Sequence, residues 1–238
     1  MEKEKNLFKK ATRANKKLRI ALTGPSGSGK TYSALLLATG LSDKVALVDT
    51  ESNSSTHYTD LFNYDYIDYN EHFESHIYRN YLDMIDMAEK NGYEVLVIDS
   101  FSHAWTGHKG ILELNEAYAN KEFRGNTWAA WSKTNVTAYY PLINKLLVES
   151  KMHIICTMRS KTEHAMDKDG AGKTVIRKIG TKTQQRDDVI YEFDTVLGLQ
   201  HGEEGLVFPE KDRTRVVLSE GLTVDNKLVE KFKNYLKS

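Results

Sequence analysis

One short segment constrains the fold of this chain more than any other: a glycine-rich G-x-x-x-x-G-K-T pattern between an apolar segment and a helical one. It consists of Gly24, Pro25, Ser26, Gly27, Ser28, Gly29, Lys30 and Thr31. Glycines let the backbone curl until successive N–H groups point at phosphate oxygens, and the following helix adds its positive N-terminal end. In such a loop the lysine reaches the β- and γ-phosphates and the hydroxyl residue binds Mg²⁺. The pattern predicts a nucleoside triphosphate site formed by residues 24–31 and the adjoining Tyr32, with Lys30 and Thr31 in these roles.

Strand and helix signals alternate around this loop. Residues 18–23 have the pattern of a buried strand, and residues 32–38 that of an apolar helix closed by Gly40. Further strands are predicted at 44–49, 64–69, 93–100, 152–157, 193–199, 206–208 and 215–218, further helices at 73–91, 135–150 and 226–236, and a hairpin at 162–179. This order predicts an α/β fold with a mostly parallel sheet flanked by helices, and ligands at the carboxyl ends of the strands.

Length and composition favour a single α/β domain. A chain of 238 residues can bury a substantial core, and no long Gly/Ser-rich stretch marks an internal linker. No apolar run is long enough to span a membrane, and the charged N-terminus lacks the apolar core of a signal peptide. The single cysteine, Cys156, excludes an intramolecular disulfide. We expect a cytoplasmic protein with no membrane partner, in which Cys156 is a small buried strand residue.

Charge is unevenly distributed although the formal net charge is +0. The N-terminal segment carries Lys3, Lys5, Lys9, Lys10, Arg13, Lys16, Lys17 and Arg19 against Glu2 and Glu4. A second segment carries Arg159, Lys161, Lys168, Lys173, Arg177, Lys178, Lys182 and Arg186 against Glu163, Asp167 and Asp169. Such segregation is typical of a polyanion binder, and a solvated surface is the competing explanation.

Two acidic residues at predicted strand ends supply groups for hydrolysis, which phosphate binding alone does not. Asp99 ends the apolar segment 95–98, the position of a carboxylate that holds Mg²⁺ or its water at a strand tip. Glu51 follows the predicted strand 44–49, so we expect it at the same edge of the sheet. There it would orient or activate the attacking water. An ordinary strand-end cap and an ordinary surface turn are the alternatives for these two residues.

The order of these motifs resembles the RecA-type ATPase core. The loop through Tyr32 and on to residue 35, together with residues 157–163, is similar to the phage-encoded AAA-type ATPases associated with single-strand annealing and recombination. Residues 185–187 and 191–194 belong to the same resemblance, which covers about residues 7–200. It implies a basic N-terminal arm at 1–17 and a RecA-like ATPase domain at 18–238, with ATP and Mg²⁺ as cofactors and the host cytoplasm as location.

The resemblance also assigns roles to individual residues. It makes Glu51 the catalytic glutamate, which acts together with Lys30 and Asp99. The γ-phosphate sensor of RecA-type proteins is often a glutamine, whereas Thr157 and Met158 stand in that neighbourhood here, so the sensor is left open. Three cations, Arg159, Lys161 and Arg186, are candidates either for contacts to DNA or for trans fingers that neutralise γ-phosphate charge across a subunit interface.

Single-stranded DNA is the partner that the resemblance implies. The loops that bind it in that family correspond to about residues 102–128 and 160–184, and the second loop is the basic segment. A basic hairpin suits sequence-tolerant strand binding. The candidate DNA-binding residues are Lys161, Lys173, Arg177, Lys178 and Arg186. The tryptophans, Trp105, Trp128 and Trp131, are predicted to be core residues rather than stacking platforms.

The N-terminal segment contains a candidate oligomerisation motif. Phe8 and Ala11 match the F-x-x-A peptide that RadA-type recombinases insert into a neighbouring subunit. This match predicts a homo-oligomer, either a ring or a filament, and an ordinary basic terminus is the alternative. A single-strand-binding protein is a further candidate partner.

Three hypotheses for function result. The first is a Mg²⁺-dependent ATP-binding and hydrolysing protein that binds single-stranded DNA and supports phage-type recombination or strand annealing. The second is a P-loop kinase of a small metabolite, with residues 160–180 as a basic lid. The third is a nucleotide-gated protein-interaction module. An ABC-type ATPase is disfavoured because the chain has no Leu-Ser-Gly-Gly segment.

Overall fold

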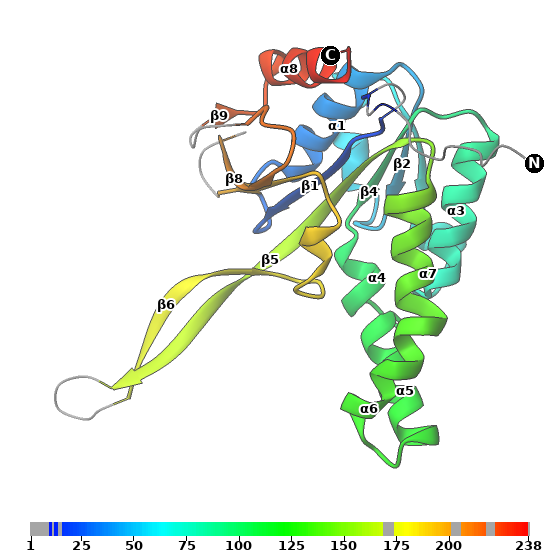
Figure 1. Cartoon of the computed structure of the whole chain (residues 1–238), viewed down its shortest axis with the longest axis vertical. Coiled ribbons are helices and arrows are strands. Elements are labelled where there is room, and N and C mark those ends of the chain that lie inside the picture. The colour runs from blue at the N-terminus through cyan, green and yellow to red at the C-terminus, as the bar shows by residue number, and fades with distance from the viewer. Residues whose placement is uncertain are drawn as a thin grey trace, which may run out of the picture.

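The computed structural model describes residues 10, 12–13, 16–168, 174–200, 206–217 and 222–237 (Figure 1). Its strands form one sheet in the order β3-β2-β4-β5-β1-β7-β8-β9, with β6 paired to the outer part of β5. Strands from β3 to β7 along this order run parallel, whereas β8 and β9 are antiparallel to their neighbours. The described strands are β1 (Arg19–Gly24), β2 (Val45–Asp49), β3 (Asp65–Asp68), β4 (Val95–Asp99), β5 (His153–Lys168), β6 (Thr174–Thr183), β7 (Thr195–Leu199), β8 (Leu206–Asp212) and β9 (Leu222–Thr223).

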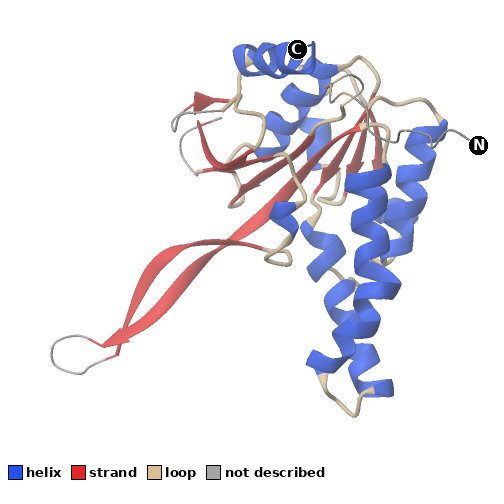
Figure 2. Ribbon diagram, viewed as in Figure 1, coloured by secondary structure: helices blue, strands red, loops and turns tan. Residues whose placement is uncertain are grey.

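Helices cover both faces of this sheet (Figure 2). The α-helices are α1 (Lys30–Leu41), α2 (Tyr69–His72), α3 (Tyr78–Lys90), α4 (Ser102–Thr106), α5 (Ile111–Glu122), α6 (Thr127–Thr134), α7 (Tyr140–Ile143) and α8 (Asn226–Lys237). Two short 3₁₀ turns, η1 (Ser54–Tyr58) and η4 (Val189–Tyr191), and two π-helical segments, η2 (Asn135–Tyr139) and η3 (Asn144–Glu149), complete the described helical elements. The α/β P-loop core predicted from the sequence, with a mostly parallel sheet and a hairpin insertion, is confirmed.

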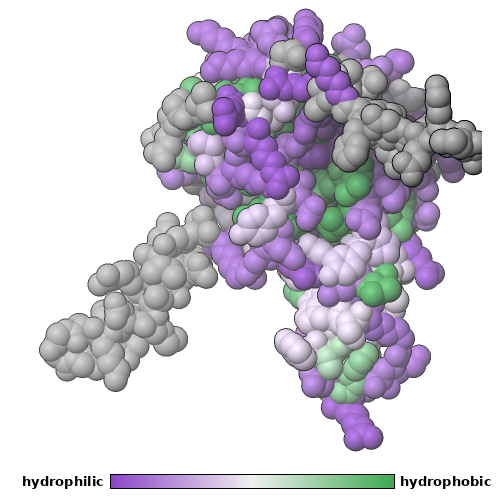
Figure 3. All heavy atoms as spheres, viewed as in Figure 1, coloured by the Kyte–Doolittle hydropathy of each residue, from purple (hydrophilic) through white to green (hydrophobic). Residues whose placement is uncertain are grey.

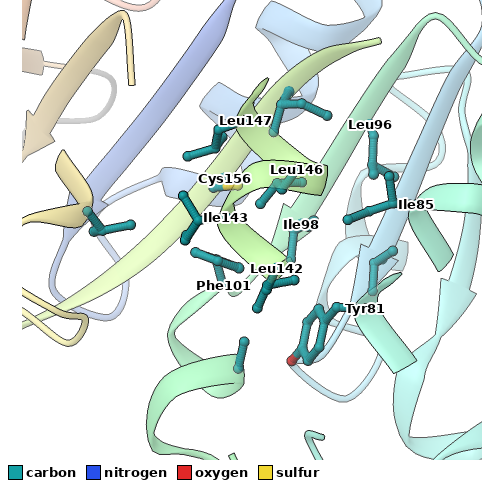
Figure 4. Packing of buried hydrophobic residues seen from close by; sticks show 14 of the residues in the cluster. Tyr81, Ile85, Leu96, Ile98, Phe101, Leu142, Ile143, Leu146, Leu147 and Cys156 are labelled. Atoms are coloured by element: carbon teal, nitrogen blue, oxygen red, sulfur yellow. The ribbon is translucent and has the colours of Figure 1, made fainter. Parts of the chain in front are cut away.

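The two faces of the sheet bury separate hydrophobic clusters. On one face, α3, η2, α7 and η3 pack over side chains that include Leu96, Ile98 and Cys156 (Figure 4). On the other face, α1 and α8 pack over a cluster that includes Val95 and Val97. Adjacent residues of β4 thus enter opposite clusters, which explains why its sequence is continuously apolar. Cys156 is fully buried among these residues, as predicted.

Two extensions leave the sheet where parallel strands end (Figure 1). The first, here called the hairpin, comprises the described residues 160–168 and 174–183, where the outer half of β5 pairs with β6. The second, here called the helical arm, comprises α5 and α6 and follows β4 through α4. Figure 3 shows that white and green side chains gather on part of the helical arm beside hydrophilic ones. Both extensions therefore connect directly to the edge at which a ligand is expected.

Helix boundaries differ from the prediction at three places. The helix predicted at 135–150 begins already at Thr127 and runs on through π-helical segments on either side of Pro141, which has no N–H to donate. The helix predicted at 73–91 begins only at Tyr78. Gly40 does not close α1, which continues to Leu41; instead a Cβ at Gly40 would lie 2.4 Å from Val229 Cγ1, so glycine allows α8 to approach closely.

The strand predicted at 215–218 is absent from the described residues 213–217. Arg215 has a φ of 59°, outside the strand region. The side chain of Asp212 accepts hydrogen bonds from Thr214 N at 2.8 Å and Val217 N at 2.7 Å, which closes a turn instead. Local side-chain hydrogen bonds of this kind compete with strand pairing. In the described parts of the chain, no helix combines the length and hydrophobicity needed to cross a bilayer.

A buried arginine connects the helix η3 to the start of β5. The guanidinium of Arg19, 6 % exposed, donates to the carbonyls of Leu147 at 2.8 Å, Ser150 at 2.6 Å and Met152 at 2.6 Å. These carbonyls lie at and just after a helix C-terminus, where the helix itself leaves them without partners. Arg19 therefore fixes the junction from which β5 runs toward the proposed site.

Replacing Arg19 with methionine is expected to destabilise the fold by about 3 kcal/mol or more, because several buried carbonyls lose a charged donor while the volume is kept. Urea unfolding monitored by circular dichroism measures this change. Arg79→Met is the matched control, since Arg79 lies on the surface of α3. A loss below about 1 kcal/mol for Arg19→Met would contradict this role of the guanidinium.

Candidate active site

The phosphate-binding loop lies between β1 and α1, as predicted. Gly27 and Gly29 have φ angles of 76° and 82°, which residues with a Cβ rarely adopt. Within the loop, the carbonyl of Pro25 accepts hydrogen bonds from Ser28 Oγ at 2.9 Å and from Lys30 Nζ at 2.7 Å. Burial lowers the pKa of Lys30, although the charges of nearby Asp99 and Glu51 counteract this shift. The loop thus holds its lysine with a neutral partner that a phosphate oxygen can replace.

A cavity of about 480 Å³ opens over this loop. It brings together most of the residues predicted from the sequence to bind or hydrolyse a nucleotide. The lining residues are Ser26, Gly27, Gly29, Lys30, Thr31, Glu51, Ser54, Tyr58, Asp99, Arg159, Ser160 and Gln184. Tyr32 is not among them; its ring packs edge-on against Tyr58 at 6.0 Å and against Phe62 at 5.3 Å between centroids. Gly24, Pro25 and Ser28 form the loop without lining the cavity.

The two predicted Mg²⁺ ligands contact each other in this cavity. Thr31 Oγ1 donates to Asp99 Oδ2 at 2.6 Å, and Thr157 Oγ1 donates to the other carboxylate oxygen. Burial raises the pKa of Asp99; hydrogen bonds from Thr157 and Thr31 lower it, and the net shift is upward. Hydroxyl and carboxylate oxygens are the ligands that Mg²⁺ prefers, so the residues present fit this ion. Nowhere in the described chain do three or more His, Cys, Asp or Glu side chains form a metal-binding cluster.

Glu51 also lines the cavity, in a two-point contact with Arg159. Arg159 Nε donates to Glu51 Oε1 at 2.8 Å, and Arg159 Nη2 donates to Glu51 Oε2. Burial alone would raise the pKa of Glu51, but the hydrogen bonds and charge of Arg159, with the charges of His103 and Lys30, lower it. Arg159 thus extends into the cavity of its own chain, where both carboxylate oxygens of Glu51 are engaged.

Two side chains before Glu51 hold its backbone in place. Asp49, fully buried, accepts from Glu51 N at 2.7 Å and from Ser55 Oγ at 2.6 Å. Thr50 Oγ1 accepts from Ser100 N at 2.7 Å and lies 2.7 Å from His103 Nδ1. The end of β2 is therefore tied both to the loop after it and to the start of α4, which fixes the position of Glu51.

Comparison with protein families identifies the fold. A family model described as an AAA domain matches residues 16–223, which include the phosphate loop, every cavity residue and the hairpin. The chain belongs to this AAA domain family. AAA domains of this type are P-loop ATPases, so nucleotide binding is established at the level of the family. No curated protein matches the chain.

Four cavity residues of this AAA domain were not predicted: Ser54, Tyr58, Ser160 and Gln184. Ser54 and Tyr58 belong to η1, in the polar and aromatic stretch after Glu51 that has no periodic signal. Ser160 Oγ is buried without a hydrogen-bond partner, which marks it as a group that a ligand can satisfy. Gln184 reaches the cavity because its N–H pairs with the carbonyl of Arg159 at 2.7 Å across the base of the hairpin.

The candidate DNA-binding residues of the AAA domain are distributed along the hairpin. Lys161 is exposed at its base, and Arg177 and Lys178 lie on β6, paired in register with Ala165 and His164 of β5. Lys173, like Phe8 and Ala11 of the predicted oligomerisation motif, lies outside the described residues.

Arg186 is already engaged within the chain. It donates to Asn135 Oδ1 at 2.7 Å, pairs with Asp188 at 2.9 Å and lies over the ring of Tyr139 at 4.5 Å. These contacts anchor the segment that follows the hairpin on η2, which contains Asn135 and Tyr139.

The prediction that all three tryptophans belong to the core is wrong for one of them. Trp105 is 8 % exposed and stacks on Trp131, with ring centroids 5.4 Å apart and planes at 13°. Trp128, in the first turn of α6, is 85 % exposed. It lies on the helical arm beyond the sheet, where no second layer covers it.

Asp99→Asn is expected to raise the melting temperature of the AAA domain without Mg²⁺, by about 2–4 °C for each kcal/mol gained. Because folding raises the pKa of Asp99, this group stabilises the fold below its unfolded pKa, and that contribution is lost as pH rises through the folded pKa. Asparagine is neutral at every pH, so this variant places no charge at the buried position. Calorimetry at pH 7 and at pH 4 with a chelator measures the shift, and the exposed Asp43→Asn is the control. A change in melting temperature for Asp99→Asn that is no more favourable at pH 7 than at pH 4 would contradict the pKa direction.

Proposed function

We propose that this AAA domain binds and hydrolyses ATP with Mg²⁺ and that its nucleotide state controls binding of single-stranded DNA, in phage-type recombination or strand annealing. The observation that carries this proposal is the continuity of β5. Thr157 on this strand contacts Asp99 in the nucleotide cavity, Arg159 contacts Glu51, and the hairpin begins at Ser160. A shift of these residues toward a nucleotide would therefore move the base of the hairpin.

Each cavity residue has its own role in the proposed hydrolysis. Lys30 binds the β- and γ-phosphates, and Thr31 and Asp99 hold Mg²⁺, which when bound withdraws charge from the triphosphate oxygens. Glu51 orients the attacking water and accepts its proton. Tyr58 offers an aromatic ring at the cavity wall.

Arg159 regulates Glu51 in this proposal. Both oxygens of Glu51 accept from Arg159, which lowers the pKa of Glu51, so the carboxylate is a weaker acceptor for a water proton while this pair persists. A γ-phosphate is a second anion within the same cavity and competes for the guanidinium. Transfer of Arg159 to the phosphate would free Glu51 and neutralise transition-state charge from within the same chain, in place of a trans finger.

Arg159→Ala is expected to shift the acidic limb of the ATPase pH profile to higher pH. Arg159 lowers the pKa of Glu51, so without it the effect of burial dominates and the carboxylate is protonated at a higher pH. Values of kcat/KM for ATP between pH 5 and pH 9 measure the shift, because they report ionisations of the nucleotide-free protein, and Arg124→Ala on the surface is the control. An acidic limb at the wild-type pH would show that Arg159 does not set the ionisation of Glu51.

The hairpin supplies the proposed DNA contact through Lys161, Lys173, Arg177 and Lys178. Over residues 160–183 basic residues outnumber acidic ones, which suits a phosphate backbone. Its return strand leads into Gln184, which lines the nucleotide cavity, and Gln185, whose Nε2 donates to the carbonyl of Phe101 at 3.0 Å just before α4. Gln184 and Gln185, which are neighbours in the sequence, thus contact the nucleotide cavity and the residue before α4, the helix that leads to the helical arm.

Assembly into a homo-oligomer, as a ring or filament, completes the proposal. We propose that the basic arm at 1–17 is separate from the ATPase domain at 18–238 and that Phe8 and Ala11 mediate subunit contact. An apolar groove of about 270 Å³ beside the edge strand β3, with Tyr66 45 % and Met87 54 % exposed, is available as a receptor surface. A single-strand-binding protein is a further proposed partner.

Equilibrium strand binding with and without a non-hydrolysable ATP analogue tests the proposal. We expect the analogue and Mg²⁺ to tighten binding of a labelled 30-nucleotide single strand about 10-fold, within the usual range of coupling between sites. Affinity should fall as salt rises. Duplex DNA of the same length is the control and should bind more weakly. Phosphate transfer to a metabolite without any strand binding would overturn the proposal in favour of a kinase.

A further inference from the structure

A second cavity, of about 770 Å³, lies between the helical arm and the base of the hairpin. Its walls include Trp105, Trp128 and Trp131 on one side and Lys182, Gln185 and Arg186 on the other. We call it the tryptophan groove. The chain has 3 tryptophans, so every one of them lines this groove.

The tryptophans form a fixed wall and an exposed platform. Trp105 and Trp131 stack on each other, and Trp105 also meets Tyr139 edge-on at 6.0 Å between centroids. Packed in this way, they cannot rotate without disturbing the cluster under η2. Trp128 remains 85 % exposed at the groove edge. An indole presented beside two packed indoles provides a flat apolar surface at little entropic cost to a ligand.

The charges of the groove select a neutral ring rather than a phosphate. Lys182 pairs with Asp187 at 2.8 Å and Arg186 pairs with Asp188 at 2.9 Å, and both carboxylates also line the groove. Each groove cation therefore has an anion beside it. In the hairpin next to the groove, by contrast, basic residues outnumber acidic ones. Apart from the groove residue Lys182, residues 160–183 carry Lys161, Lys168, Lys173, Arg177 and Lys178 against Glu163, Asp167 and Asp169.

We infer that the tryptophan groove holds an unpaired nucleobase stacked on Trp128, while the hairpin contacts the phosphates of the same strand. A single-stranded nucleic acid presents flat rings and a charged backbone side by side, which matches the groove and the hairpin together. A duplex does not, because its bases are stacked on one another. This inference rests on the proposed function, and it adds the place where the base binds and the residue that stacks on it.

Intrinsic fluorescence tests the groove directly, because all tryptophan emission originates there. A labelled (dT)₂₀ strand is titrated with protein, and its anisotropy reports binding independently of the tryptophans. In a parallel titration of protein with unlabelled strand, we expect quenching with the same midpoint as the anisotropy change. Trp128→Ala should weaken binding by about 5- to 150-fold, the usual effect of losing one stacked base, and Trp128→Phe should restore part of it.

Tyr140→Ala is the matched control, since Tyr140 is 46 % exposed on α7 but does not line the groove. It should bind the strand as the wild type does. If the strand binds but Trp128→Ala binds it with wild-type affinity, the inference is overturned and the proposed function stands. If no strand binds to the wild type, both are overturned. Binding of duplex with the same dependence on Trp128 would also overturn the inference.

Discussion

Glu51→Gln is expected to reduce ATP hydrolysis by about 10²–10⁴-fold while ATP binding persists, because the amide cannot accept a proton from the attacking water. The substitution keeps the side-chain size, and its carbonyl oxygen can still accept a hydrogen bond from Arg159. Asp49 and Thr50 hold the backbone of Glu51 through contacts that do not involve its side chain. Steady-state phosphate release and binding of a fluorescent ATP analogue measure the two effects separately.

Glu116→Gln provides the control for this change, because Glu116 is exposed on the helical arm away from the cavity. It should hydrolyse ATP at the wild-type rate. Hydrolysis by Glu51→Gln within about threefold of the wild type would remove Glu51 from the mechanism. The acid that activates water would then have to be sought elsewhere at the carboxyl edge of the sheet.

Lys30→Ala is expected to weaken ATP binding by about 10- to 150-fold and to abolish measurable hydrolysis, since hydrogen bonds to charged groups contribute about 1.5–3 kcal/mol each. Lys30 Nζ donates to the carbonyl of Pro25, a contact that holds the amine at the loop where phosphates are expected. Calorimetric titration with a non-hydrolysable ATP analogue measures the affinity. The melting temperature should change little, because alanine removes a partly desolvated charge together with a single hydrogen bond.

Lys44→Ala controls for the loss of a lysine. Lys44 is paired with Glu94 at 3.7 Å on the surface, and it does not line the nucleotide cavity. Its nucleotide affinity should equal that of the wild type. Wild-type affinity in Lys30→Ala would exclude the glycine-rich loop as the triphosphate site and would contradict the account at its starting point.

Local patterns predicted the elements that carry the site. The glycine-rich loop has its own sequence signature, and Asp99 and Glu51 are recognisable because parallel strands bring their carboxyl ends to one edge. Continuous apolar segments such as Val95–Ile98 also identify central strands. These signals need only neighbouring residues, and so the P-loop core and the closeness of Lys30, Asp99 and Glu51 followed from sequence.

Such local patterns could not predict contacts between residues that are far apart in the sequence. The pair of Glu51 and Arg159 joins residues 108 positions apart, and only the register of β5 against β1 and β4 brings Arg159 to the cavity. The exposure of Trp128 depends on how far the helical arm projects from the sheet, which no local period encodes. Gln184 reaches the cavity through the pairing at the hairpin base, a contact that also requires the folded chain.

The ATPase rate with and without single-stranded DNA tests the central claim, that the nucleotide cavity and the strand-binding surfaces act together. At saturating ATP and Mg²⁺, we expect a single strand to stimulate hydrolysis about 10-fold, a change of the size typical for coupled sites. Stimulation should disappear in Glu51→Gln and decline as salt is raised. An ATPase rate that is the same with single strand, duplex and no DNA would contradict the account.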